Sequence, residues 1–191
     1  MNRKEPIFDG QYYHAYNRGN RKQPIFGDKS DYLSCIKKFR DASVTYGVRV
    51  VVYTLMPNHF HFVLVQTEGG SIRRFMNSVG TSMAKRFDLK YGQVGHLFQS
   101  RYRYNVIESE ASLLVVARYI HLNPVEARLV RHPEDWPYSD FAMWVSRANL
   151  DEGVLQHGMI SEDGRLLQES LPFSPRDYVA FVRSAHCAGA L

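Results

Sequence analysis

The chain has 191 residues, 45% of them hydrophobic, and a formal net charge of +5. This length and hydrophobic content fit one substantial core with a small appendage, and they exclude wholesale disorder. No apolar run approaches the roughly 20 residues of a membrane span, and the first residues lack the apolar core of a signal peptide. We therefore expect a cytoplasmic protein without a membrane partner.

The first half of the chain predicts four regular elements. In chain order they are a strand at 11–17, a helix at 29–46, and strands at 48–55 and 59–65. Gly47 stops the helix, and Pro57-Asn58 makes a tight connection between the last two strands, which predicts an antiparallel hairpin. The β-branched run at 48–55 is typical of a strand in the centre of a sheet.

The second half begins with three further elements. They are a helix at 71–90, a strand at 101–107 and a helix at 109–122. Ser71 and Ser109 are of a residue type that caps helix N-termini. The order strand, helix, strand, strand, helix, strand predicts an α+β fold of ferredoxin-like type, in which helices pack on an antiparallel sheet.

The segment after residue 131 carries large aromatic residues and is predicted to pack back on the domain. These residues are Trp136, Tyr138, Phe141 and Trp144. The residues from 149 onward are polar, with one helix-like piece near 175–184. We therefore divide the chain into a domain at 1–147 and a C-terminal extension at 148–191 that packs on or near it.

His59 and His61 lie two residues apart in the predicted strand 59–65. Side chains alternate along a strand, so both imidazoles project to one face, with Phe60 and Phe62 on the other. Two imidazoles one pleat apart can share a metal ion. A pair supplies only two ligands, and the alternative of one core histidine and one solvated histidine stays open.

Tyr119 and Asn123 are four residues apart at the end of the last predicted helix, so they lie on one face. If this face looks at the His59 strand, Tyr119 becomes a nucleophile and Asn123 an oxygen ligand of the metal. Two alternatives stay open. Tyr119 also suits a core position, and Asn123-Pro124-Val125-Glu126 reads as a helix start with Asn123 as its N-cap.

Basic residues interleave with aromatic residues in the chain. The predicted DNA-binding residues are Arg18 and Arg21 in one loop, Arg73 and Arg74 at a helix start, and Arg101, Tyr102 and Arg103 in a strand. Cations for phosphates and flat rings for bases are what a single-stranded nucleic acid needs. The alternative is scattered surface charge beside aromatic core residues.

Four short blocks of sequence carry a family resemblance. They are YHAYNRGN at 13–20, MPNHFH at 56–61, GHLFQSRY at 95–102 and RYIHLNPV at 118–125. Taken in this order, they resemble the single-tyrosine HUH transposases, and most closely the REP-associated tyrosine transposases of bacteria. The resemblance covers roughly residues 10–145. The chain departs from the family pattern at 126–128, so the target sequence is not carried over.

The resemblance implies a role for each candidate residue. His59 and His61 become metal ligands, Asn123 the third ligand and Tyr119 the catalytic nucleophile. It further implies a ferredoxin-like catalytic domain that acts on single-stranded DNA hairpins such as REP-like repeats. The implied cofactor is Mg²⁺ or Mn²⁺, and the chain is expected to work as a monomer or a homodimer.

The expected function is a metal-dependent DNA transposase that cleaves and rejoins single-stranded DNA through a 5′-phosphotyrosine intermediate. A phenol is mostly protonated at neutral pH and is a weak nucleophile, so a divalent cation on the scissile phosphate is needed. His121 faces away from Tyr119 and is not expected to be its base. His14 and His96 are interpreted as structural, with contacts to phosphate or to a metal ligand as the alternative.

Two other functions stay open. The first is a domesticated, non-catalytic protein that binds single-stranded DNA hairpins, which leaves the four residues of the metal and nucleophile set unexplained. The second is a metal hydrolase of small phosphoesters, which leaves Tyr119 and the basic and aromatic residues without a role.

Overall fold

The computed structural model describes residues 6–149 and 174–188. Its strands are β1 (Tyr12–Arg18), β2 (Val48–Met56), β3 (His59–Gln66) and β4 (Arg103–Ile107). Its helices are α1 (Lys29–Thr45), α2 (Ile72–Tyr91), α3 (Glu110–Glu126), α4 (Phe141–Ala148) and α6 (Pro175–Ala188), with 3-10 turns at Asn20–Lys22 and Pro133–Asp135. Within the described ranges, no helix is long and apolar enough to cross a membrane.

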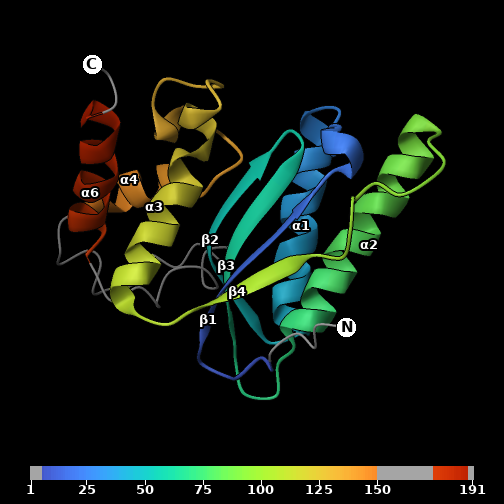
Figure 1. The fold of residues 1–191 in the computed structure, drawn as a ribbon, viewed down its shortest axis with the longest axis horizontal. Coiled ribbons are helices and arrows are strands. Elements are labelled where there is room, and N and C mark those ends of the chain that lie inside the picture. The colour runs from blue at the N-terminus through green and yellow to red at the C-terminus, as the bar shows by residue number, and fades with distance from the viewer. Residues whose placement is uncertain (1–5, 150–173, 189–191) are drawn as a thin grey trace.

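The described strands form one antiparallel sheet in the order β2-β3-β1-β4 (Figure 1), which confirms the predicted α+β fold. The prediction that the 48–55 strand is central is wrong, because β2 lies at an edge of the sheet. Its β-branched residues reflect burial on both faces instead. Part of this edge is covered where the backbone N–H of Leu55 donates to the carbonyl of Tyr138 at 2.9 Å.

Helices cover both faces of the sheet, with α1 and α2 on one face and α3, α4 and α6 on the other (Figure 1). Strand β3 serves both cores because its side chains alternate. Phe60 and Phe62 join the core under α1 and α2, whereas Val63 and Val65 join the core under α3. The two histidines of β3 share the α3 side with these valines.

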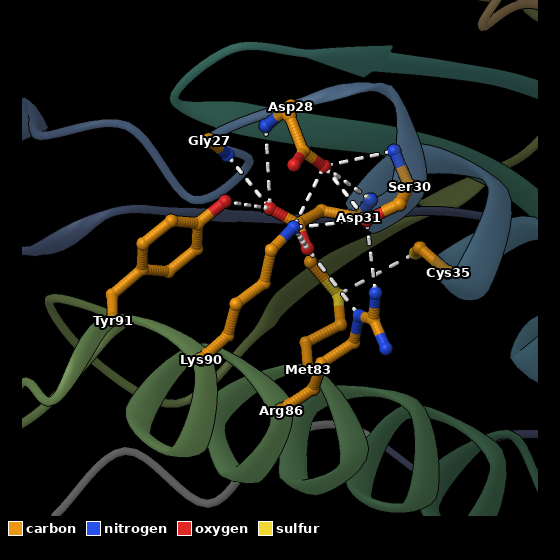
Figure 2. Close-up of polar contacts among 9 residues, drawn as sticks. All are labelled: Gly27, Asp28, Ser30, Asp31, Cys35, Met83, Arg86, Lys90 and Tyr91. Carbon is orange, nitrogen blue, oxygen red and sulfur yellow. Dashed lines mark hydrogen bonds and ion pairs between the residues drawn. The ribbon is translucent and has the colours of Figure 1, made fainter.

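Asp31 joins the start of α1 to the end of α2 (Figure 2). Its carboxylate accepts hydrogen bonds from Lys90 Nζ at 2.9 Å and from the Tyr91 hydroxyl at 2.7 Å, beside the Asp28 side chain that caps α1. Burial alone raises the pKa of Asp31, but these hydrogen bonds and those from backbone N–H groups lower it to about 2. A charged carboxylate therefore holds together the two helices behind β3.

Helix α3 passes through Pro124 and ends at Glu126, beyond the predicted end at Leu122. Proline removes one backbone donor, yet the helix continues because the N–H of Ala127 still donates to the Asn123 carbonyl at 2.9 Å. The alternative reading of Asn123 as a helix N-cap is therefore wrong. Inside a helix, its side chain lies one turn from Tyr119 on the same face.

A buried polar network holds α3 against α4 and α6. His121 is fully buried, with Nδ1 2.6 Å from the Tyr178 hydroxyl and Nε2 3.0 Å from Asp140 Oδ1. Asp140 Oδ1 also accepts the backbone N–H of Tyr53 at 2.7 Å, and its Oδ2 accepts Nε1 of Trp144 at 3.0 Å. The aromatic segment thus packs back on the domain, as predicted.

The helix-like piece predicted near 175–184 is α6. The guanidinium of Arg118 stacks 4.1 Å from the ring centroid of its Phe181, which ties α6 to the side of α3. Residues 150–173 of the predicted C-terminal extension lie outside the described residues, and the predicted boundary after residue 147 stays a prediction.

Candidate functional site

The predicted chemical residues come together between β3 and α3. The rings of His61 and Tyr119 lie 5.6 Å apart, centroid to centroid, and Nε2 of His59 lies 3.3 Å from Oδ1 of Asn123. One face of α3 therefore looks at the histidine strand, which is the condition on which the expected roles of Tyr119 and Asn123 depend. Residues far apart in the sequence share one site because α3 crosses the sheet face to which both imidazoles project.

A pocket of about 350 Å³ opens at this site. It is lined by Tyr16, Asn17, Arg18, His59, His61, Gln99, Ser100, Arg103 and Tyr119. The Tyr119 side chain is 44% exposed, and its hydroxyl makes no hydrogen bond to any described residue. Its phenol oxygen is therefore accessible to a molecule that enters the pocket.

Burial keeps the site histidines uncharged. It lowers the pKa of His61 well below its usual value, with further lowering by electrostatic repulsion from His14, His59 and Arg18 when these groups carry charge. It also lowers the pKa of His59, although the contact with Asn123 acts in the opposite direction, and it lowers the pKa of His14 to about 4. At neutral pH these imidazoles each keep a lone pair, which is the state that binds metals.

The hydrogen bonds around His59 leave two lone pairs facing each other. The Asn58 amide donates to the Lys22 carbonyl at 3.0 Å, so its oxygen, 2.6 Å from His59 Nδ1, accepts the proton of that nitrogen. The Asn123 amide likewise donates to the Tyr119 carbonyl at 2.9 Å, which turns its oxygen to His59 Nε2. In neutral His59 this Nε2 is also an acceptor. A cation held between the two atoms would satisfy both.

His14 supports the second histidine. Its Nε2 lies 2.9 Å from Nδ1 of His61, so one of the two nitrogens donates to the other. When Nδ1 of His61 is the donor, Nε2 of His61 carries the free lone pair that a metal needs.

The donor set fits a divalent cation. Two neutral imidazoles and one amide oxygen leave coordination positions open for phosphate or water, as a catalytic site requires. The described residues contain no group of three His, Cys, Asp or Glu side chains placed to hold a metal. A third ligand drawn from these residues would be a neutral oxygen donor, and Oδ1 of Asn123, 3.3 Å from His59 Nε2, is placed for that role.

The sequence from β1 to Asn123 matches a known family. Residues 8–123 match the family described as Transposase IS200 like. The chain belongs to the IS200-like transposase family. The matched range contains both histidines, Tyr119 and Asn123, and no curated protein matches the chain.

Two solved structures are similar to this transposase. The first, described as the REP-associated tyrosine transposase bound to a REP hairpin, is 18% identical and covers 79% of this chain and 88% of its own, with a TM-score of 0.65. This likeness supports the fold alone. The second is a protein from Deinococcus radiodurans R1 described as a transposase, 18% identical, covering 63% of this chain and 95% of its own. Its TM-score is 0.44.

The predicted DNA-binding residues of the transposase divide into two groups. Arg18 and Arg103 line the pocket of Tyr119, while Arg101 and Tyr102 line a separate groove between α2 and the segment 95–102, on the other face of the sheet. The charge of Arg73 acts on the Tyr102 phenol, which places Arg73 near that groove. The structure brings Arg21 and Arg74 neither to the pocket nor to the groove. Arg21 lines a separate hollow around residues 93–97, and Arg74 is exposed in the first turn of α2.

Two residues support the candidate histidines: sequence reasoning gave Asn58 no such role and gave it to His14 only as an alternative. Asn58 was interpreted only as part of a tight turn, yet it orients the ring of His59. His14 was interpreted as structural, yet it contacts His61, which is the stated alternative. Their positions in the sequence could have indicated these contacts, because Asn58 adjoins His59 and His14 lies in a predicted strand of the same sheet. His121 makes its contacts with α6 and Asp140, away from the pocket, as expected.

Proposed function

We propose that this transposase cleaves and rejoins single-stranded DNA near hairpin repeats, with Tyr119 as the nucleophile. The observation that carries the proposal is the pair of facing acceptors, His59 Nε2 and Asn123 Oδ1, beside the accessible phenol of Tyr119. A protein that only binds DNA has no need of such a set. A hydrolase of small phosphoesters has no need of the tyrosine.

The proposed reaction is one in-line displacement at a DNA phosphate. The phenol oxygen of Tyr119 forms a bond to phosphorus, and the bond from phosphorus to the 3′ oxygen of the upstream strand breaks. The phenol proton passes to water, and the departing 3′ oxygen takes up a proton. The resulting 5′-phosphotyrosine keeps the energy of the phosphodiester, so a 3′ hydroxyl of another strand can reverse the step.

His59, His61 and Asn123 would hold the divalent cation. When bound, the cation supplies Lewis acidity that offsets negative charge on the scissile phosphate. Mg²⁺ or Mn²⁺ is the proposed cofactor. Imidazole ligands suit Mn²⁺ better, because Mg²⁺ prefers oxygen.

Arg18 and Arg103 support a polyanionic substrate at this site. Both line the pocket of Tyr119, and the Nε atom of Arg18 is buried without a hydrogen-bond partner among the described residues. A buried guanidinium donor without a partner is costly, and a phosphate oxygen satisfies it. The similar structure bound to a REP hairpin makes REP-like hairpins the first DNA to test for this chain.

The test is formation of a covalent adduct between the protein and DNA. Wild-type protein is incubated with single-stranded hairpin DNA and Mn²⁺ or Mg²⁺, then separated on a denaturing gel. We expect a shifted band that disappears in Tyr119→Phe and in His59→Ala. Tyr16→Phe is the matched control, because Tyr16 lines the same pocket but is not the proposed nucleophile. Its band should remain.

Two outcomes would contradict the proposal. A band that survives in Tyr119→Phe shows that another residue is the nucleophile. Absence of a band with both metals, despite measurable hairpin binding, favours a non-catalytic hairpin-binding protein.

A further inference from the structure

The three proposed metal ligands bring no negative charge to the site. His59 and His61 supply imidazole nitrogens and Asn123 supplies an amide oxygen, and all three groups are uncharged when they bind a metal. The affinity of a protein site for a divalent cation falls as the number of charged ligands falls. Charges beside these ligands therefore have a large influence on whether a cation is held.

Arg18 on β1 brings a fixed positive charge to the same site. It lies directly opposite His59 in the antiparallel pairing of β1 with β3, and residues paired in this way have side chains on one face, with Cβ atoms about 4.5–5.5 Å apart. The charge of its guanidinium lowers the pKa of both His59 and His61. Arg18 is therefore close enough to oppose a cation held by these imidazoles.

No carboxylate of the described chain neutralises the guanidinium of Arg18. This side chain makes no ion pair with any described residue, and its Nε atom is buried without a hydrogen-bond partner among them. The described residues that line the pocket include a second cation, Arg103, but no Asp or Glu. The protein by itself thus places positive charge beside the metal ligands with no negative charge to offset it.

Backbone hydrogen bonds hold Arg18 in this position. The N–H of Gln99 donates to the Arg18 carbonyl at 3.0 Å, and the N–H of Gly19 donates to the Asn58 carbonyl at 2.8 Å. Asn58 is also the residue whose side-chain oxygen lies 2.6 Å from Nδ1 of His59. The end of β1 therefore cannot carry Arg18 away from His59 without breaking these hydrogen bonds.

We infer that Arg18 opposes binding of a divalent cation to the three proposed ligands until a phosphate group of the substrate enters the pocket. A phosphate attracts both the cation and the guanidinium, and its negative charge offsets the repulsion between them. The metal and DNA then bind cooperatively. The inference rests on the proposed function, because it takes this phosphate to belong to the DNA that Tyr119 attacks.

The inference predicts effects of opposite sign on the two ligands. Arg18→Gln removes the positive charge, so it should tighten the binding of Mn²⁺ to the DNA-free protein and weaken the binding of hairpin DNA in metal-free buffer. Damage to the fold would weaken both. A side chain that only contacts phosphate would change DNA binding and leave Mn²⁺ binding unchanged.

The first measurement is Mn²⁺ binding without DNA, followed by the EPR signal of the free ion. We expect Arg18→Gln to bind Mn²⁺ at least about threefold more tightly than wild type, because like charges this close repel each other even in a medium of high dielectric constant. Arg18→Lys keeps the charge and should bind Mn²⁺ as weakly as wild type. Arg74→Gln removes the same charge from an exposed position in the first turn of α2 and should have no effect.

Three results of this measurement would overturn the inference. They are equal Mn²⁺ affinities of wild type and Arg18→Gln, the same gain in Arg74→Gln as in Arg18→Gln, and absence of Mn²⁺ binding by both wild type and Arg18→Gln.

The second measurement tests the cooperativity in the Tyr119→Phe background, where the DNA stays intact. Fluorescence anisotropy gives the affinity for single-stranded hairpin DNA with and without Mn²⁺. We expect Mn²⁺ to tighten hairpin binding at least about tenfold, and saturating hairpin to tighten Mn²⁺ binding by the same factor, because coupling between two bound ligands is reciprocal. Adding His59→Ala should abolish the effect of Mn²⁺. Hairpin affinity that does not respond to Mn²⁺ would contradict cooperative binding.

Both measurements are independent of cleavage. If Arg18→Gln fails to tighten Mn²⁺ binding, the inference about Arg18 fails even when wild-type protein forms the covalent adduct. If both ligands respond as expected but wild-type protein forms no adduct, the inference holds for binding and the proposed chemistry fails.

Discussion

Nε2 of His14 on β1 lies 2.9 Å from Nδ1 of His61 on β3. The contact joins a partly buried imidazole on one strand to a candidate metal ligand on its neighbour. If Nδ1 of His61 donates its proton to His14, the lone pair of His61 lies on Nε2. His14 would then act on a bound cation through His61, without contacting the cation.

Replacing His14 with Phe should weaken Mn²⁺ binding by about 10–100-fold, the usual cost of losing the partner of a metal-bound histidine. The reason is that His61 loses the acceptor that fixes its tautomer. Isothermal titration calorimetry with Mn²⁺ measures the effect. His14→Gln should recover part of the affinity, because its amide oxygen can accept a hydrogen bond. Equal Mn²⁺ affinity in wild type and His14→Phe would show that His14 does not contribute to metal binding.

Arg103→Ala should weaken binding of a single-stranded hairpin and reduce the salt dependence of that binding. Arg103 lines the pocket of Tyr119, where a phosphate is expected. Loss of one phosphate contact should reduce the slope of log K against log salt by about 1. Titrations at several KCl concentrations give this slope.

Arg74→Ala is the control for Arg103→Ala. It removes the same charge from an exposed position in the first turn of α2. We expect a smaller change in slope, because the structure does not place Arg74 at the pocket. Equal changes in the two variants would mean that general surface charge, rather than a pocket contact, sets the salt dependence.

Much of the fold follows from local sequence patterns. Helix α2 is an example. A capping residue at Ser71, an apolar stripe that includes Phe75 and Val79, and a terminating Gly92 together predict it, and in the structure these residues cap the helix, face the core and end the helix. Local sequence patterns did not predict that β2 lies at the edge of the sheet. A β-branched run reports burial on both faces, and α1 and α3 provide that burial at the edge of the sheet as well as a central position would.

The candidate site was predictable in part. Spacing placed His59 and His61 on one face, and Tyr119 and Asn123 on another, but only tertiary packing brings the two faces together. The bond between His14 and His61 depends on strand order, which local patterns do not give. Pro124 misled local reasoning about Asn123, because proline is equally compatible with a helix start and with a helix that loses one hydrogen bond.

Tyr178→Phe should destabilise the protein by about 1–3 kcal/mol, the usual cost of leaving a buried polar group without its partner. The Tyr178 hydroxyl is 2.6 Å from Nδ1 of His121, and both side chains are fully buried. Urea denaturation at neutral pH gives the free energy of unfolding. Tyr46→Phe is the control, because its hydroxyl bonds to none of the described residues, and its effect should stay within about 0.5 kcal/mol. Similar effects of the two substitutions would contradict a stabilising role for the network.

Asp31 should make stability depend on pH in the acid range. Its hydrogen bonds with Lys90 and Tyr91 (Figure 2) outweigh the effect of burial and lower its pKa in the folded protein to about 2, against an ordinary value near 3.9 in the unfolded chain. A group with a lowered folded-state pKa stabilises the fold above its unfolded-state pKa. That contribution disappears as the pH falls through the folded-state value.

Asp31→Asn tests this dependence. A shift of nearly two units corresponds to about 2.6 kcal/mol, and solvent screening of the partly exposed partner Lys90 reduces the expected loss at pH 7 to about 1–2 kcal/mol. The difference from wild type should shrink between pH 4 and pH 2, as followed by urea denaturation at each pH. Asp41→Asn, at an exposed position of the same helix, should change stability little at any pH. A deficit in Asp31→Asn that stays constant down to pH 2 would show that its cause is lost packing rather than lost charge.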